Sequence, residues 1–140
     1  TVPGGDLFLI MDAPVAGPLL RGFGRVLDRE FRTATFRKGV DFAVEIGDPV
    51  YSVADGEVRF AGWFRGYGKL VILDHGGEYF SVSGHLDAID VEVGEEVRGG
   101  DPIGLAGETG SLSGPRLYFE IRKGSGALDP ADWLRPVPEG

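Results

Sequence analysis

The chain has 140 residues, of which 42% are hydrophobic, so it can bury a core as one domain without help from a metal or a disulfide. It contains no cysteine, which excludes a disulfide framework, a thiolate zinc site and a cysteine nucleophile. Its 22 acidic and 14 basic residues give a net charge of −8, which opposes general binding to nucleic acid or anionic lipid. This charge suits a basic protein surface or a neutral ligand, unless it only keeps the domain soluble. No apolar run approaches the roughly 20 residues that a bilayer-spanning helix needs.

Short apolar runs, separated by glycine and proline, follow one another closely along the chain, a rhythm typical of many short strands joined by tight turns. Two short segments favour helix, Leu27–Arg32 and Pro130–Leu134. The predicted strands, in chain order, are Val50–Val53, Gly56–Phe64, Lys69–Asp74, Glu78–Ser83, Pro102–Ala106 and Arg116–Arg122. No window of a dozen residues shows an apolar stripe of helical period. The fold class is therefore predicted to be mostly β, with little helix.

One pattern of glycine-flanked turns and Asp-Pro steps recurs in two forms, at residues 47–58 and at residues 93–104. Glycine permits the positive φ that sharp strand corners need. The pattern resembles the barrel-sandwich arrangement of biotinyl and lipoyl domains, which present a modifiable lysine on a hairpin tip. None of Lys38, Lys69 and Lys123 has that setting, so we do not expect a swinging-arm carrier.

The segment Arg116–Arg122 separates two kinds of side chain when it is read as a strand, because successive residues point to opposite faces. The face suited to a core carries Leu117, Phe119 and Ile121. The opposite, solvent face carries Arg116, Tyr118, Glu120 and Arg122. We therefore expect alanine at Arg116 or Tyr118 to leave the fold intact.

This strand belongs to a series of motifs that resembles the LytM (lysostaphin-type) domain of zinc endopeptidases, which cut peptidoglycan cross-links. The motifs occur in the family's order and spacing over about residues 13–134. The matching segments are Ala13–Gly17, Phe23–Gly24, Arg37–Phe42, Pro49–Gly56, Gly66–Gly68, Ser83–Leu86, Gly114–Glu120 and Asp129–Leu134. The resemblance implies a LytM-like barrel-sandwich, the duplicated hybrid motif, with short antiparallel strands around a groove.

The resemblance also implies where the family's metal chemistry would lie. Active members hold zinc with the His and Asp of a His-x-x-x-Asp motif and with the last His of His-x-His. Two further histidines act on the metal-bound water and the tetrahedral intermediate. Carried over position by position, the ligands become Arg37, Asp41 and Tyr118, and the catalytic histidines become His85 and Arg116. One ligand of the three and one histidine of the two therefore remain.

These replacements do not suit zinc. Catalytic zinc takes three protein ligands and keeps a position open for water. Arginine cannot lose its proton to become a ligand, and a guanidinium ~4 Å from Zn²⁺ costs on the order of 8 kcal/mol at an effective dielectric of ~20. We therefore expect no metal, no cofactor and no hydrolase activity. The minor alternative is an active zinc endopeptidase with an unorthodox site, for example one improvised from Asp41, His75 and His85.

The remaining polar residues have structural interpretations. We expect Asp41 to accept hydrogen bonds from Arg37 or Arg116 instead of serving as a remnant ligand. We expect His85 to line the groove or to have a structural role, because a base without a metal-bound water has nothing to activate. His75 lies at a strand end beside a turn and is expected to be an ordinary surface residue.

Arginine and aromatic side chains indicate that the groove binds a protein segment, although drift after loss of the metal would also leave such residues there. Arg and Tyr are favoured at interface hot spots. Trp63, Phe64 and Tyr67 lie within five residues of one another beside a glycine-flanked loop. The predicted binding groove comprises Arg37, Asp41, Trp63, Tyr67, His85, Arg116, Tyr118 and Glu120.

The form of the degeneracy is similar to that of EnvC-type murein hydrolase activators, through the Gly66–Gly68 loop and the final site strand. In these proteins an inactive LytM domain follows a coiled coil that the FtsE–FtsX complex engages at the division site. The LytM groove captures an inhibitory helix of an N-acetylmuramoyl-L-alanine amidase and so opens the amidase's zinc site.

The resemblance implies that residues 1–140 are a single degenerate LytM domain, the C-terminal part of a longer protein of the periplasm or cell envelope at the division site. Its expected partners are the amidase's regulatory helix and, through an upstream region, the FtsE–FtsX complex. Peptidoglycan is a further candidate partner, and nucleic acid is not expected. The alternative is a peptidoglycan-binding or scaffold module that activates no hydrolase.

Overall fold

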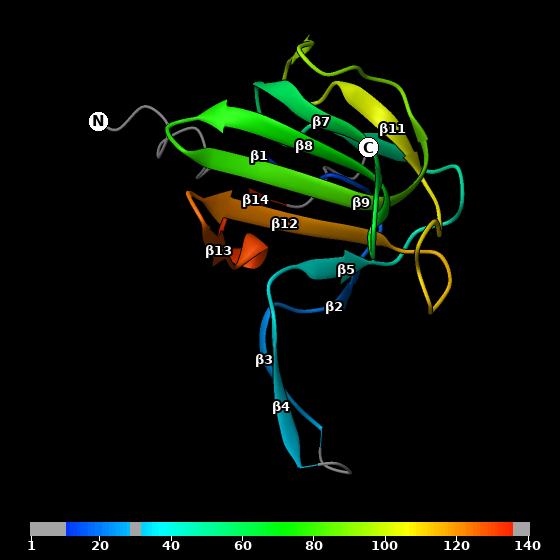
Figure 1. Cartoon of the computed structure of the whole chain (residues 1–140), viewed down its shortest axis with the longest axis vertical. Coiled ribbons are helices and arrows are strands. Elements are labelled where there is room, and N and C mark those ends of the chain that lie inside the picture. Colours follow the sequence, from blue (N-terminus) through cyan, green and yellow to red (C-terminus); the bar gives the residue numbers. More distant parts are fainter. Residues whose placement is uncertain (1–10, 29–31, 136–140) are drawn as a thin grey trace.

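The computed structural model describes residues 11–28 and 32–135 and consists of β-strands with one short 3-10 helix (Figure 1). The elements are β1 (Met11–Asp12), β2 (Leu19–Arg21), β3 (Gly24–Asp28), β4 (Thr33–Arg37), β5 (Val40–Phe42), β6 (Pro49–Tyr51), β7 (Gly56–Phe64), β8 (Gly68–Gly76), β9 (Tyr79–Ile89), β10 (Glu96–Val97), β11 (Pro102–Ala106), β12 (Leu117–Lys123), β13 (Gly126–Leu128), η1 (Pro130–Asp132) and β14 (Leu134–Arg135). The mostly β prediction is confirmed. In the described part of the chain, no helix is long and apolar enough to cross a membrane.

All six predicted strands form. β7 and β11 have the predicted bounds, and β6, β8 and β12 differ from them by one or two residues at their ends. β9 runs on past Ser83 to Ile89, because its second half pairs with a different strand from its first. The predicted helix near the end is present as η1, where the Asp129 carboxylate caps the first turn by accepting from the Ala131 N–H at 3.0 Å.

The predicted helix at Leu27–Arg32 is wrong where the structure describes it. Leu27 lies in β3 and pairs with Ala34 of β4, and residues 29–31 lie outside the described residues. The β4 segment Thr33–Arg37 contains two β-branched threonines, which favour an extended backbone. A cross-strand partner of this kind outweighed the weak local preference for helix.

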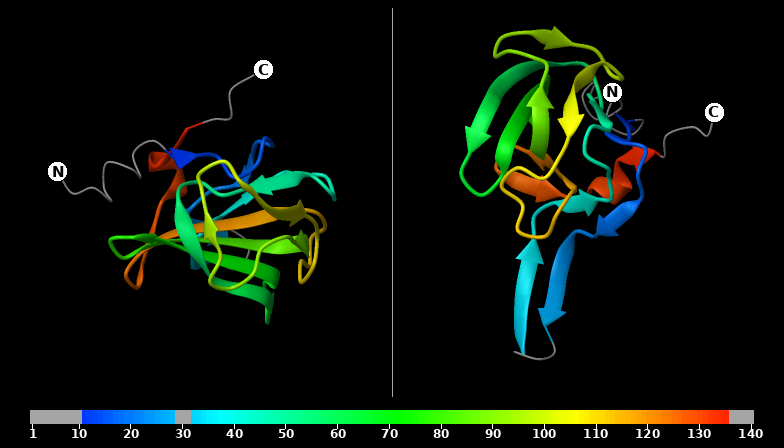
Figure 2. Two further views of the ribbon diagram at one scale, coloured as in Figure 1. Left: turned by 90° about the horizontal axis from the view of Figure 1, so that it is seen from above. Right: turned by 90° about the vertical axis from the view of Figure 1, so that its right-hand side faces the viewer.

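The main sheet has the strand order β10-β7-β8-β9-β12-β5-β2, and its pairings are antiparallel. β9 changes partner along its length: residues 79–84 pair with β12, and residues 86–89 pair with β11, which also pairs with β6. The change occurs at Gly84–His85. β9 therefore belongs to two strand layers, which diverge at that point (Figure 2).

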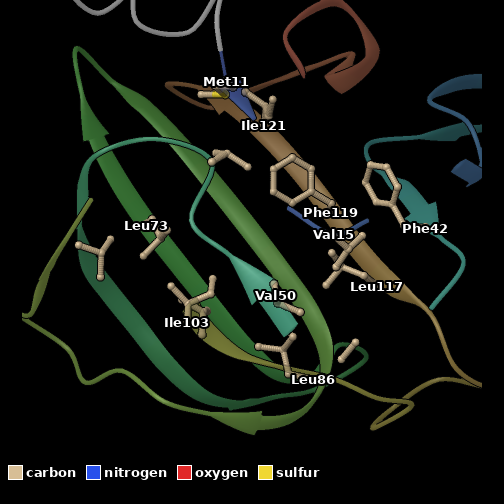
Figure 3. Packing of buried hydrophobic residues seen from close by; sticks show 14 of the residues in the cluster. Met11, Val15, Phe42, Val50, Leu73, Leu86, Ile103, Leu117, Phe119 and Ile121 are labelled. Carbon is tan, nitrogen blue, oxygen red and sulfur yellow. The ribbon is translucent and has the colours of Figure 1, made fainter. Parts of the chain in front are cut away.

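The core lies on the inner face of this sheet (Figure 3). Leu117, Phe119 and Ile121 of β12 are at most 1% exposed, so the predicted core face of this strand is confirmed. Phe119 contacts Phe42 of β5 edge to face, with 6.3 Å between the ring centroids. These contacts fix β12 against β5. They therefore also fix the positions of the side chains on the opposite face of both strands.

The segments near the two ends of the described chain meet beside the core. β1 and β14 form a parallel pair in which Met11 lies opposite Leu134. Met11 is 1% exposed and lies near Ile121 (Figure 3). Val15, which follows β1, is 2% exposed. The segment from Met11 to Val15 therefore covers part of the core.

β3 and β4 form a separate two-stranded hairpin that projects from the body (Figures 1 and 2). Gly24 pairs with Arg37 at its base, and Asp28 pairs with Thr33 at its far end. We call the described residues of this projection, 23–28 and 32–38, the arm.

Phe119→Ala should lower the free energy of unfolding by about 3–5 kcal/mol, because it removes a fully buried ring and leaves a cavity. Denaturant unfolding followed by tryptophan fluorescence measures the change. Leu112→Ala is the matched control, since Leu112 is fully exposed and its truncation should cost less than about 0.5 kcal/mol. Equal unfolding curves for wild type and Phe119→Ala would contradict this description of the core.

Candidate functional site

A groove lies where β9 changes partner, and part of the loop between β11 and β12, residues 107–116, forms one wall. Its lining includes six of the eight residues predicted for binding, namely Arg37, Asp41, Tyr67, His85, Arg116 and Tyr118. The other lining residues are Gly66 and residues 110–113. The prediction missed these positions because a Gly-Ser-Leu-Ser sequence indicates only a loop.

Strand register brings the groove residues together from distant parts of the sequence. Tyr118 of β12 pairs with Asp41 of β5 on one side and with Gly84 of β9 on the other. Side chains directly opposite one another on paired strands share a face of the sheet. Asp41 and Tyr118 therefore stand side by side, and Gly84 leaves space beside them.

His85 stands at the bend of β9 with a φ of +62°, which is uncommon for a residue other than glycine. Its backbone N–H donates to the Tyr67 carbonyl at 2.7 Å, and its Nδ1 donates to the Thr109 carbonyl at 2.8 Å. Its ring faces Tyr118 edge on, with 6.2 Å between the centroids. His85 therefore lines the groove and also holds its wall, as predicted, in a backbone conformation of the kind found at functional sites.

Thr109 fastens the loop wall to the sheet. Its hydroxyl donates to the Leu86 carbonyl at 2.5 Å and accepts from the Lys69 N–H at 3.0 Å. The approach is so close that a Cβ on Gly68 would lie 2.1 Å from the Thr109 carbonyl oxygen, and one on Gly110 would lie 2.5 Å from the Gly68 nitrogen. Both glycines also have a positive φ. The two glycines thus allow the loop to pack directly on the start of β8.

Asp41 is the centre of the polar part of the groove. Arg37 Nη2 and Arg116 Nη1 donate to the same oxygen, Asp41 Oδ2, at 2.9 and 3.0 Å. Asp41 is 4% exposed and Arg116 is 9% exposed. Charge-assisted bonds of this kind are stronger than neutral ones. The prediction that Asp41 accepts from Arg37 or Arg116 is confirmed, and it accepts from both.

The expectation that Arg116 lies on a solvent face is wrong. Its guanidinium turns over the neighbouring strand to Asp41, and its Nη2 donates to the Ser113 carbonyl at 3.1 Å. Its Nε is buried without a hydrogen-bond partner among the described residues. Arg116 therefore holds the loop wall and the sheet together, and replacing it cannot leave the fold unaffected.

Tyr118 and Glu120 form a second polar pair on the same strand. The Tyr118 hydroxyl donates to Glu120 Oε2 at 2.6 Å, and Arg122 Nε donates to Glu120 Oε1, also at 2.6 Å. Burial, followed by the bond to the Glu120 carboxylate, raises the pKa of Tyr118 well above its ordinary value. The same carboxylate raises the pKa of Arg122. The phenol thus keeps its proton, and Arg122 keeps its charge.

A second hollow on the same sheet, which we call the sheet depression, adjoins the groove. Its lining is Phe64, Tyr67, Leu70, Ile72, Phe80, Val82, Glu120 and Arg122. Tyr67 lines both hollows, and its ring lies 5.3 Å from that of Tyr118 and 5.8 Å from that of Phe64. The two hollows therefore form one surface that is polar at the Asp41 end and apolar over β8 and β9.

Sequence reasoning missed most of the sheet depression. It placed Glu120 in the groove, whereas Glu120 lines the sheet depression at 2% exposure. Alternation along β8 and β9 could have identified Leu70, Ile72, Phe80 and Val82 as one face, but not that this face forms a hollow in which Ile72 and Phe80 stay partly exposed. Trp63 lines neither hollow and is 63% exposed. It neighbours Phe64 on the strand, so the two side chains point to opposite faces.

His75 is not the ordinary surface residue that its sequence indicates. Its Nδ1 donates to the Asp55 carbonyl and its Nε2 accepts from the Ser81 hydroxyl, both at 2.7 Å, in the neutral tautomer consistent with these partners. Burial lowers the pKa of His75, against the opposing effects of Asp55 and Asp74. His75 lines a hollow on another part of the molecule, away from Asp41.

The groove's donor set does not fit catalytic zinc. The Asp41 oxygen that faces inward already accepts from two guanidiniums, and the Tyr118 phenol keeps its proton. Within residues 11–28 and 32–135, no three side chains of His, Cys, Asp or Glu gather closely enough to hold a metal ion. The improvised site from Asp41, His75 and His85 is therefore not formed. The groove instead presents charged and aromatic side chains in a concave surface.

Comparison with protein families matches residues 35–130 to peptidase family M23. The matched range contains the groove residues from Arg37 through Tyr118, together with the sheet depression. Among solved structures, a zinc-containing peptidase from Vibrio cholerae has a TM-score of 0.80 and 34% identity, over 86% of this chain and 39% of that chain. The LytM-like fold prediction is confirmed.

Two curated relatives are named as activators of murein hydrolases and not as peptidases. The murein hydrolase activator EnvC of Escherichia coli K12 is 40% identical over 121 residues, which are 86% of this chain and 28% of EnvC. The murein hydrolase activator NlpD of Salmonella typhimurium is 37% identical over 112 residues, which are 79% of this chain and 29% of NlpD. The chain spans less than a third of the length of either relative.

Arg116→Ala should lower the free energy of unfolding by about 2–3 kcal/mol, because it breaks a buried ion pair while Arg37 still partly compensates Asp41. Urea unfolding measures the loss. Arg98→Ala, at an exposed arginine just after β10, is the control and should change it by less than about 0.5 kcal/mol. If the two variants unfold alike, the Asp41 cluster is not a structural element.

His75 should make the domain less stable at mildly acidic pH. The fold holds the pKa of His75 below its ordinary value of 6.5, so the unfolded chain binds more protons between the two pKa values. The free energy of unfolding should therefore decrease as the pH falls through about 6.5. His75→Gln should show a smaller decrease between pH 7.5 and 5.5. Parallel curves for the two proteins would show that His75 is not held neutral.

Proposed function

Since this chain belongs to peptidase family M23, we propose that it is a member without catalytic activity, which activates a peptidoglycan hydrolase instead of cutting peptidoglycan itself. The observation that carries the proposal is the Asp41 carboxylate held by two guanidiniums, where the resemblance places the zinc ligands. The relatives named as murein hydrolase activators support it.

The hydrolase that we propose is an N-acetylmuramoyl-L-alanine amidase, and the bound segment is its inhibitory helix. An amphipathic helix binds a groove through apolar anchors on one face, with polar contacts at the margins. The sheet depression supplies apolar contacts through Phe64, Ile72 and Phe80, which are exposed or partly exposed. Tyr67 and Tyr118 continue this surface into the groove. Arg122 at one end and Arg37 at the other would hold the polar ends of such a helix.

Activation would follow from a shift between two states of the amidase. In one state the inhibitory helix covers the amidase's own site, and in the other the helix is released. A groove that binds only the released helix favours the active state by its difference in affinity. Moving such an equilibrium from 1:99 to 99:1 takes about 5.5 kcal/mol of differential binding, which a few desolvated aromatic and arginine contacts can supply.

The setting of this activity is also part of the proposal. The domain would act in the periplasm or cell envelope at the division site, where its target is assembled. Control by the FtsE–FtsX complex would pass through a region outside this chain, which covers less than a third of its activator relatives.

Purified domain should raise the release of dye from labelled sacculi by the amidase of the same organism. Tyr118→Ala and Arg122→Ala should each raise the concentration for half-maximal activation on the order of tenfold or more, because Tyr118 is an aromatic anchor of the surface and Arg122 holds one polar end of the helix. Val93→Ala and Arg98→Ala, at exposed positions outside both hollows, are the matched controls. A thermal melt of each variant separates lost binding from lost folding.

Two results would contradict the proposal. Dye release by the domain alone that zinc increases and a chelator abolishes would make it a hydrolase. Release that stays at the level of the amidase alone, with the wild-type domain folded, would leave the binding or scaffold module as the better description.

A further inference from the structure

Positive and negative residues are unevenly distributed along the chain. The segment Arg21–Lys38 holds six of the 14 basic residues and two of the 22 acidic ones, which gives it a net charge of +4. The other 122 residues then carry a net charge of −12. A basic segment of this size on so acidic a domain creates its own local potential, because charges more than ~8–10 Å apart are largely screened at physiological salt.

This basic segment includes the part of the molecule that projects, so far as the structure describes it. It contains the arm, whose strands β3 and β4 pair only with each other among the described residues (Figures 1 and 2). Arg25 and Arg32 are both exposed, as is Lys38 at the base. The projection therefore carries positive charge away from the negative body.

The arm also presents apolar surface beside these charges. Phe36 lies opposite Arg25 in the strand register and is 59% exposed, with one edge contact to Phe23 at 5.3 Å between centroids. Leu19 and Leu20, on β2 near the base of the arm, are about half exposed. An isolated hairpin is at best marginally stable in water. Exposed apolar groups rimmed by charge on such an element are typical of a surface that another protein covers.

The base of the arm is part of the groove. Arg37 ends β4, lines the groove and binds Asp41, while its Nε donates across the hairpin to the Gly22 carbonyl at 3.2 Å. A protein seated in the groove would therefore lie next to the arm. The continuity of the two surfaces favours one partner for both.

We propose that the arm is a second docking site, for an acidic segment of the same protein that occupies the groove. This inference rests on the proposed function for the identity of that protein. A discrete acidic segment can meet the arm alone, whereas an extended anionic surface, such as a membrane, would also face the body with its charge of −12. The exposed Phe36 offers an apolar contact, which a protein surface can use and a purely anionic polymer cannot.

The arm would act mainly on the rate of encounter. Exposed charges at the rim of an interface chiefly change the association rate and its salt dependence, and have less effect on the final complex. Charge on a projecting element reaches a partner before the groove does. The arm would thus orient the partner over the groove and leave the extent of activation at saturation unchanged.

The test measures association of the domain with the purified amidase of the same organism by stopped-flow fluorescence, at about 50 and 300 mM salt. Arg25→Glu and Arg32→Glu should each lower the association rate on the order of threefold to tenfold at low salt, and much less at high salt. Arg98→Glu, which changes the net charge equally at an exposed site on the body, should stay within about twofold of wild type. Dye release at saturating domain should equal wild type for all three variants.

The outcomes separate the two proposals. If wild type binds and activates but both arm variants associate as fast as wild type, the arm inference is wrong and the groove proposal stands. If wild type does not bind the amidase, both are wrong. The arm inference would also be wrong if the two arm variants bound the amidase like wild type but lost binding to anionic vesicles or to sacculi, or lost self-association.

Discussion

The convergence of two guanidiniums on Asp41 determines the shape and the charge of the groove. Arg37 arrives from the arm and Arg116 from the loop wall, so one buried carboxylate ties together three parts of the chain that are distant in sequence. Removing one partner from a buried ion pair is costly, because it leaves charge without compensation. The cluster therefore fixes the shape of the groove, and its positive charge opposes a divalent cation. The same interaction that supports the structure occupies the carboxylate that the resemblance places among the zinc ligands.

The scaffold around this cluster is that of a peptidase, and its geometry suits a long bound segment. β9 changes partner at Gly84–His85, and the loop held by Thr109 crosses there, so the sheet is open on one face from Asp41 to Arg122. Where a metal would have required a few ligands at fixed distances, the present residues offer a continuous surface with charged ends. The function of a protein depends on the site that its fold carries, and we propose that this site serves recognition instead of reaction.

Much of this could be read from the sequence, because strand alternation and residue chemistry are local. Leu117 and Phe119 were identified as core by their period alone, and arginine at a ligand position is a poor ligand in any structure. The exposure of Arg116 was misjudged because alternation does not show that an arginine can reach across a strand to a carboxylate 75 residues away. The hollow over β8 and β9, and the hairpin in place of a helix at Leu27, depend on tertiary contacts that no local pattern contains.

The most direct test of the central claim is an NMR titration of the ¹⁵N-labelled domain with a synthetic peptide of the amidase's inhibitory helix. We expect saturable amide shifts that map to both hollows, with the largest at Tyr67, His85, Tyr118 and Arg122, which line them. Shifts confined to residues outside the groove and the sheet depression, or none at millimolar peptide, would contradict the account.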